Sequence, residues 1–288
     1  MACFDCPREC KSSSFCGKSQ DKVRIAKVMR HFFEEPIICS SEKGCGAIFF
    51  SYCSLKCAYC QNYEITHEGK GIDYSPQKLT HIFEDVANSG VTSLDLVTPT
   101  HYTSYILTAL ENANINVPVV WNTSGYERCE NIEKLSKYVD IFLFDFKYYD
   151  SSLAMKLSKA PNYFDVCMSA LKKARELIPH DVVQNGIMKK GIIVRHLVLP
   201  GHTDDSIKIF EEIKNKVGTD VYVSLMSQFY PCYKACDMGL NRTLLPLEYK
   251  KVLASLKRLG FNKGFVQEMS SADKCYTPSF DLKKHYEL

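Results

Sequence analysis

Three cysteines in one short loop are the residues of this chain whose type and spacing are best suited to chemistry. They are Cys53, Cys57 and Cys60, and an apolar, β-type run at residues 47–51 directly precedes them. The run predicts a buried strand, so the thiols follow the carboxyl end of a strand, where α/β proteins place their active sites. Closely spaced thiolates can reach neighbouring irons of a cubane iron–sulfur cluster. Three ligands on four irons leave one iron open, which is typical of a catalytic metal site.

A zinc site or a set of unligated thiols is the alternative for this loop. Zinc requires a fourth ligand at a matching spacing and commonly uses paired Cys-x2-Cys units. Unligated thiols rarely fall at this spacing immediately behind a strand. The spacing therefore favours an iron–sulfur cluster over both alternatives.

The pattern Cys-x3-Cys-x-aromatic-Cys, with Tyr59 as its aromatic residue, resembles the signature of the radical S-adenosylmethionine (SAM) enzymes. With Gln61 and Asn62 following, the loop is similar to the branch that contains the glycyl-radical-enzyme activases, such as pyruvate formate-lyase-activating enzyme, and their uncharacterised iron–sulfur homologues. The resemblance implies a 4Fe-4S cluster that cleaves SAM reductively to a 5′-deoxyadenosyl radical, which abstracts hydrogen from a substrate. It also implies an oxidoreductase reduced by flavodoxin or ferredoxin, with a glycyl radical enzyme as a candidate substrate.

Two other functions stay open on the sequence. The first is a radical modification of a peptide or a small molecule, because no feature of the sequence names the substrate. The second is a non-catalytic zinc-binding protein, in which the thiols serve only as metal ligands.

Residues 1–46 form a cysteine-rich leader with a second group of thiols, which consists of Cys3, Cys6, Cys10 and Cys16. Four thiols are a complete ligand set for zinc or for a second iron–sulfur cluster, and four cysteines within 14 residues cannot all pack as core. We therefore predict a second metal site here, with the ion left open. Cys39 and Cys45 are expected to be small buried residues instead.

The composition limits the protein class. The 288 residues are 45% hydrophobic with a net charge of +3, and no long basic run suggests a nucleic-acid partner. Neither a signal region at the start nor a run of membrane-spanning length is evident, so a cytoplasmic protein is expected. The 14 cysteines are too dilute for a disulfide scaffold, and in a reducing compartment clustered cysteines indicate metal.

From residue 47 onward, short β-type runs alternate with amphipathic helical runs, which indicates parallel strands with helical crossovers. The strands are expected at residues 47–51, 93–97, 119–121, 141–146, 192–199 and 221–225. The helices are expected at residues 76–88, 102–112, 132–138, 164–178, 204–217 and 246–259. Six such units predict an α/β fold, the partial (β/α)6 TIM-type barrel of the resembled family, over residues 47–288.

The ends of the second and third predicted strands carry polar residues that can contact a nucleoside or an amino acid. Thr98 and Thr100 stand where activases usually have Gly-Gly-Glu, which contacts the methionine amino group of SAM, so this chain departs from that pattern. Asn122 and Ser124 supply the donors and acceptors that a ribose needs.

Charged residues mark the fourth and fifth strands. Asp145 and Lys147 are two residues apart and so point to the same face of a strand. The resemblance implies that Lys147 contacts the SAM carboxylate, with Asp145 orienting it, and that Arg195 also faces a carboxylate. The resemblance also implies that Gln228, after the sixth strand, contacts adenine or substrate. Three further thiols give only weak support for a metal site: Cys232, Cys236 and Cys275.

Overall fold

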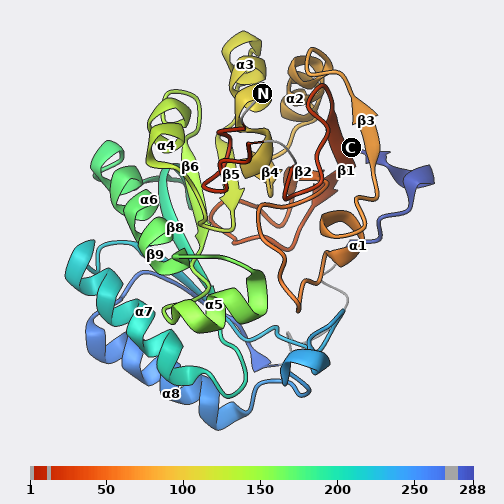
Figure 1. Cartoon of the computed structure of the whole chain (residues 1–288). Coiled ribbons are helices and arrows are strands. Elements are labelled where there is room, and N and C mark those ends of the chain that lie inside the picture. The colour runs from red at the N-terminus through yellow and green to blue at the C-terminus, as the bar shows by residue number, and fades with distance from the viewer. Residues whose placement is uncertain (1–2, 12–13, 270–277) are drawn as a thin grey trace.

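A mostly parallel sheet carries the molecule in the computed structural model, which describes residues 3–11, 14–269 and 278–288 (Figure 1). Six neighbouring strands run parallel and match the six predicted strands. They are β2 (Cys45–Phe50), β4 (Leu94–Val97), β5 (Val119–Thr123), β6 (Ile141–Asp145), β8 (Ile187–Leu197) and β9 (Tyr222–Met226). The strand order has two ends among the described residues, so the sheet is an open, partial barrel, as predicted.

Helices cover the outer face of this sheet (Figure 1). The six predicted ones are α2 (Lys78–Asn88), α3 (Thr103–Asn112), α4 (Cys129–Leu135), α6 (Tyr163–Leu177), α7 (Thr203–Lys216) and α8 (Pro246–Leu259). Helix α8 has the predicted bounds. Pro246 is favoured in a first helical turn, and Gly260 adopts the left-handed conformation, with φ 96°, that ends the helix.

Several strands at the edges of the sheet were not predicted. The long strand β1 (Val23–His31) pairs antiparallel with β2, and β10 (Gly264–Val266) extends the parallel sheet beyond β9. The short strands are β3 (Ile72–Tyr74), β7 (Val182–Gln184) and β11 (Tyr286–Glu287). Strand β1 lies in the predicted leader but pairs with β2, most of which belongs to the predicted barrel domain. The division of the chain at residue 46 stays a prediction.

Two short helices lie in loops at the carboxyl ends of the strands and were also missed: α1 (Tyr63–Thr66) and α5 (Ser151–Ser158). Helix α5 begins after Asp150, whose side chain accepts a hydrogen bond from the Leu153 amide at 2.8 Å. The four-residue helix α1 is too short to show helical periodicity in the sequence.

The segment between β1 and β2 closes the amino-terminal mouth of the barrel. Ile37 and Ile38 pack there among inward-facing residues of the strands, including Val120 and Ile141. The Ile37 carbonyl accepts a bond from the Met188 amide at 2.7 Å, which ties the segment to the sheet. Glu34 and Glu35 of the same segment line the pocket described below. Within the described part of the chain, no helix has the length and apolar character needed to span a membrane.

Candidate functional site

One pocket at the carboxyl ends of the strands contains most of the predicted site residues. The loop after β2 forms one wall, and the ends of β4, β5, β6, β8 and β9 form the other. The predicted residues that line it are Cys53, Cys57, Tyr59, Cys60, Thr98, Asn122, Ser124, Asp145, Lys147, Arg195 and Gln228. These residues come from segments far apart in the sequence, so the parallel topology brings them together.

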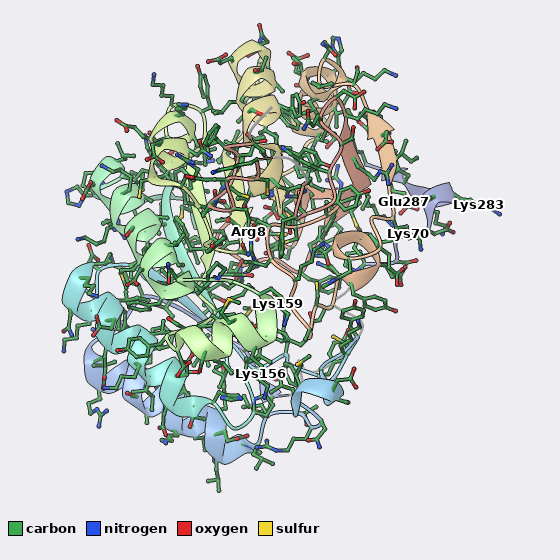
Figure 2. The ribbon with its side chains drawn as sticks, viewed as in Figure 1. Arg8, Lys70, Lys156, Lys159, Lys283 and Glu287 are labelled. Carbon is green, nitrogen blue, oxygen red and sulfur yellow. The ribbon has the colours of Figure 1, made fainter. Side chains whose placement is uncertain are left out.

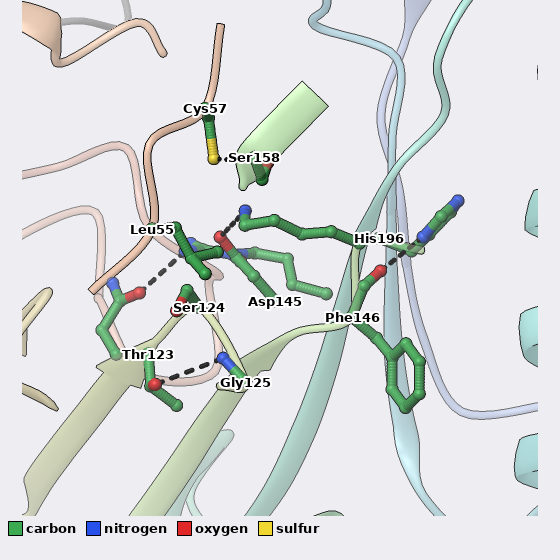
Figure 3. A network of polar contacts seen from close by, with 12 residues as sticks. Leu55, Cys57, Thr123, Ser124, Gly125, Asp145, Phe146, Ser158 and His196 are labelled. Atoms are coloured by element: carbon green, nitrogen blue, oxygen red, sulfur yellow. Dashed lines mark hydrogen bonds and ion pairs between the residues drawn. The ribbon is translucent and has the colours of Figure 1, made fainter. Parts of the chain in front are cut away.

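Helix α5 supports the cysteine loop from behind. The amides of Lys56 and Ala58 donate to the carbonyls of Ser158 and Leu157 at 3.0 and 2.7 Å. The Ser158 hydroxyl faces Cys57 and donates to its sulfur at 2.9 Å (Figure 3). The last turn of α5 therefore holds both the backbone of the loop and one of its thiols.

A chain of buried hydroxyls extends this support to the aromatic residue of the motif. The Tyr59 and Tyr148 hydroxyls are 2.6 Å apart, and the Tyr148 hydroxyl is 2.5 Å from that of Ser158. Tyr148 and Ser158 were not identified from the sequence. The only signal for Tyr148 is that it follows a buried strand, and Ser158 carries none, because its role depends on a contact across 101 residues.

Burial keeps the three thiols of the loop protonated in the absence of a metal. It raises the pKa of Cys53 to about 11 and that of Cys60 to about 12, and it also raises the pKa of Cys57. Cys57 raises the pKa of Cys53 further, and Cys57 and Cys53 both raise that of Cys60. A bound metal must therefore displace protons, and its positive charge would compensate the burial of the thiolates.

The donor set fits a polynuclear iron–sulfur cluster. No group of three or more His, Cys, Asp or Glu side chains is arranged to hold a metal ion in the parts of the chain that are described. A cubane cluster makes a different demand, because each thiolate binds a different iron and the sulfurs need not converge on one point. Three thiols on one loop that line a pocket, Cys53 buried and Cys57 and Cys60 partly buried, meet that demand. The buried Ser124 hydroxyl of this pocket has no hydrogen-bond partner in the described part of the chain, which leaves it available to a ligand.

Asp145 and Lys147 form a partly buried ion pair beside the cysteine loop. The Lys147 ammonium lies 2.8 Å from one Asp145 oxygen, and the Arg195 Nε lies 2.6 Å from the other. Burial opposes the charge of Asp145, but Arg195 and Lys147 lower its pKa to about 2. Burial likewise opposes the charge of Lys147, and Asp145 more than compensates, so the pKa of Lys147 is raised. Both groups are charged at neutral pH.

Arg195 is surrounded by protein acceptors. Besides Asp145, it donates to Glu34 at 2.7 Å and to the side-chain oxygen of Asn122 at 2.8 Å. The contact of Arg195 with a ligand carboxylate stays a prediction, because its donors already have these partners. Glu34, on the segment after β1, was missed as a site residue. An acidic pair between apolar residues at positions 32–38 was the only signal for it.

The remaining predicted site residues, Thr98, Thr100 and Gln228, differ in whether they line the pocket. Thr98 lines the pocket with φ 59°, whereas Thr100 is turned away and donates to Glu127 at 2.6 Å. The side-chain oxygen of Gln228 accepts a hydrogen bond from Gln267 at 2.8 Å. Both residues line the pocket.

The leader packs directly against the cysteine loop. Arg8 donates to the Ser54 carbonyl at 2.9 Å and also to the Lys159 carbonyl beyond α5 (Figure 2). Lys56 of the loop donates to the Cys16 carbonyl at 3.2 Å. Burial raises the pKa of Cys6 to about 12, and its three partner thiols contribute to the rise, so the four lie in one neighbourhood. The metal site predicted there stays a prediction.

The other cysteines have varied surroundings. Cys39 and Cys45 are buried, and both sulfurs contact the His31 carbonyl, at 3.2 and 3.6 Å. The Cys232 thiol donates to the Tyr59 carbonyl at 3.3 Å. Cys236 is exposed, and Cys275 lies outside the described residues.

Comparisons with known proteins agree on one family. The model of the radical SAM superfamily matches residues 47–213. The uncharacterized protein MJ0674 of Methanocaldococcus jannaschii is 33% identical over 234 residues, which are 77% of this chain and 64% of that protein. The chain thus spans less than two thirds of this curated relative.

Two solved structures share the fold at low sequence identity. The Streptococcus suis protein SuiB, bound to its precursor peptide SuiA, is 17% identical with a TM-score of 0.50 over 75% of this chain and 46% of SuiB. HydG, a maturase of the FeFe-hydrogenase, is 15% identical with a TM-score of 0.51 over 75% of this chain and 49% of HydG.

Proposed function

This chain belongs to the radical SAM superfamily, and from that premise we propose that it cleaves SAM reductively and abstracts hydrogen from a substrate. The superfamily implies a 4Fe-4S cluster and SAM as cofactors. When bound, the reduced cluster supplies the electron that cleaves SAM into methionine and a 5′-deoxyadenosyl radical. The oxidoreductase class and the activase-like role are part of this proposal.

The residues of the chain would bind, orient and shield the cofactors. Cys53, Cys57 and Cys60 would hold the cluster on the loop that α5 supports. Lys147, kept charged by Asp145, would bind the SAM carboxylate. The unpartnered Ser124 hydroxyl and the adjacent Asn122 would contact the ribose. Burial of this pocket would keep water away from the reacting atoms.

A single observation carries the proposal: three buried or partly buried thiols and a partly buried, charged Asp145–Lys147 pair line the same pocket. Removal of an ion pair from water costs free energy unless further hydrogen bonds or a bound ligand satisfy both groups. A pocket that combines cluster ligands with a cation placed for a carboxylate suits SAM, which carries both a metal-chelating amino acid and a nucleoside.

Anaerobic reduction of the cluster-loaded protein with SAM tests this function. We expect formation of 5′-deoxyadenosine, no product from Cys57→Ala, and unchanged product from Cys129→Ala, a thiol on α4 outside the pocket. Zinc as the sole metal at the cysteine loop, or no 5′-deoxyadenosine from iron-loaded protein, would contradict the proposal. The first of these outcomes would favour the zinc-binding alternative.

For partners, we propose an electron donor such as flavodoxin or ferredoxin and, as substrate, a glycyl radical enzyme. Family resemblance alone supports these two partners. The second candidate is modification of a peptide, which the fold shared with peptide-bound SuiB favours, or of a small molecule. Electron paramagnetic resonance of candidate partners distinguishes them, because only the first produces a glycyl radical on another protein.

We further propose a metal at the leader thiols Cys3, Cys6, Cys10 and Cys16, either zinc or a second iron–sulfur cluster. Their shared neighbourhood and the contact of the leader with the cysteine loop support it. Metal analysis of Cys6→Ser and Cys10→Ser variants tests the site, with loss of one metal centre expected while the centre at the loop is retained.

A further inference from the structure

A buried carboxylate at the inner end of the pocket has an oxygen with no donor. Glu35 lies on the segment that closes the amino-terminal mouth of the barrel, lines the pocket and has a side chain only 6% exposed. Its Oε2 has no hydrogen-bond partner among the residues that the structure describes, whereas a side-chain hydrogen bond with Ser224 lowers the pKa of the carboxyl. The nearest described cation, Nη1 of Arg195, is 3.7 Å away and lies closer, at 2.7 Å, to Glu34.

Negative charge exceeds positive charge in this part of the barrel. Four carboxylates and two cations meet here: Glu34, Glu35, Asp95, Asp145, Arg195 and Lys147. Asp95 is fully buried and, when ionised, can only accept hydrogen bonds. One of its oxygens also has no partner among the described residues. Among the described residues the two cations lie closest to Asp145 and Glu34, so Glu35 has only the longer ion pair with Arg195 at 3.7 Å and Asp95 has none.

A buried carboxylate without a close counter-charge must take up a proton or bind a cation. Burial raises the pKa of Glu35 to about 7, with a further contribution from Glu34 and against the opposing charge of Arg195. Burial also raises the pKa of Asp95 well above its ordinary value. A cationic ligand group that reached Glu35 would replace the proton and form a charge-assisted hydrogen bond in a site with little water.

We propose that the Glu35 end of the pocket binds a primary ammonium group of the substrate, which makes the substrate of this enzyme a cationic amine or a peptide that carries one. The inference rests on the proposed function, because it places the substrate beyond SAM in the same pocket. An ammonium fits better than a guanidinium, because a guanidinium needs two acceptor oxygens for bidentate binding, whereas Oε2 is the one Glu35 oxygen that is buried without a hydrogen-bond partner in the described part of the chain.

A metal ion is a poorer occupant of this end of the pocket. Among the residues that the structure describes, no three carboxylate, thiol or imidazole side chains are arranged around one point there. Hard cations require several oxygen ligands, whereas a single ammonium needs one strong acceptor and a few weaker ones. The side chain of His31, which also lines the pocket, is kept neutral by burial, and its pKa is lowered to about 4.

Calorimetric titration of the cluster-loaded, SAM-saturated enzyme tests the inference with two matched probes, pentylammonium and its neutral isostere 1-pentanol. We expect pentylammonium to bind about tenfold more tightly than 1-pentanol. Glu35→Gln should abolish that preference, and Glu111→Gln, an exposed carboxamide substitution on α3, should retain it. The comparison within the wild-type enzyme stands even where a variant fails to fold.

Equal affinity for the two probes in the wild-type enzyme, or an undiminished preference in folded Glu35→Gln, would overturn the inference. 5′-Deoxyadenosine is measured in the same samples. SAM cleavage without amine preference refutes the substrate class alone, whereas absence of cleavage refutes the proposed function, so the two failures are distinguishable.

Discussion

Lys147 and Asp145 are the residues through which the pocket presents a fixed positive charge. Asp145 is the last residue of β6 and Lys147 follows it two residues later, and both side chains line the pocket, where partial burial makes each depend on the other. Arg195 on the neighbouring strand supports Asp145 from the other side. The charge of Lys147 is therefore held beside the cysteine loop before any ligand enters.

Replacement of this charge should weaken SAM binding. For Lys147→Met we expect the KM for SAM to rise about tenfold or more, because a buried cation that meets a carboxylate is lost. The measurement is 5′-deoxyadenosine formation at varied SAM. Lys156→Met, an exposed lysine on α5, is the control and should leave the KM unchanged (Figure 2). An unaltered KM in Lys147→Met would contradict the assignment.

Glu35 should make the stability of the protein depend on pH. Its folded pKa of about 7 lies above the ordinary value of 4.5, so its contribution to stability is present below about pH 4.5 and is lost as pH rises through 7. Glu35→Gln removes the ionisation. We expect the free energy of unfolding of the variant, relative to wild type, to be higher by about 1–3 kcal/mol at about pH 8 than at about pH 5.

Urea denaturation of the metal-free proteins under anaerobic conditions measures this difference. Glu34 and Asp95 influence the same titration, so the comparison between variant and wild type isolates the part that belongs to Glu35. A stability difference that is the same at both pH values would show that Glu35 keeps its ordinary pKa in the folded protein.

At the scale of elements, the short helix α5 is the support of the cysteine loop. It supplies two backbone acceptors and the Ser158 hydroxyl, and Tyr148 joins that hydroxyl to Tyr59. A loop of this length has few contacts of its own that could hold three thiols in place. Its geometry therefore depends on an element about a hundred residues later in the chain.

The Tyr148 hydroxyl should be important for this support. Tyr148→Phe leaves two buried hydroxyls short of a partner, which should lower the free energy of unfolding by about 1–3 kcal/mol. Iron retention after gel filtration should fall as well. The matched control Tyr138→Phe loses only a surface contact with Glu111 and should change neither quantity measurably. Full iron retention in Tyr148→Phe would argue against the supporting role.

At the scale of the whole molecule, the fold couples metal loading to proton release. Desolvation keeps the three loop thiols protonated without metal, and a cluster requires them as thiolates. We expect loading with iron and sulfide to release protons and to be more complete at about pH 8.5 than at about pH 6.5. A pH-stat titration with iron analysis measures both. Loading that is independent of pH would contradict the thiol pKa values.

Periodicity along the sequence explains which strands and helices were predicted correctly. The six parallel strands and the helices between them follow from alternation of buried β-type runs and amphipathic runs, which short-range periodicity reveals. Strand β1 was missed because its residues 23–33 show no clear period and its pairing with β2 decides its conformation. The short helix α5 was missed because eight residues carry little helical signal.

The sequence by itself determined the cysteine motif, the order of strands and helices, and the pairing of Asp145 with Lys147, because each depends on residues close together along the chain. Only the tertiary structure decided that Glu34 meets Arg195 across 161 positions, that α5 supports the loop and that one Glu35 oxygen in the pocket has no hydrogen-bond partner among the described residues. Such contacts depend on how distant segments pack, and a packing partner leaves no periodic trace in the local sequence.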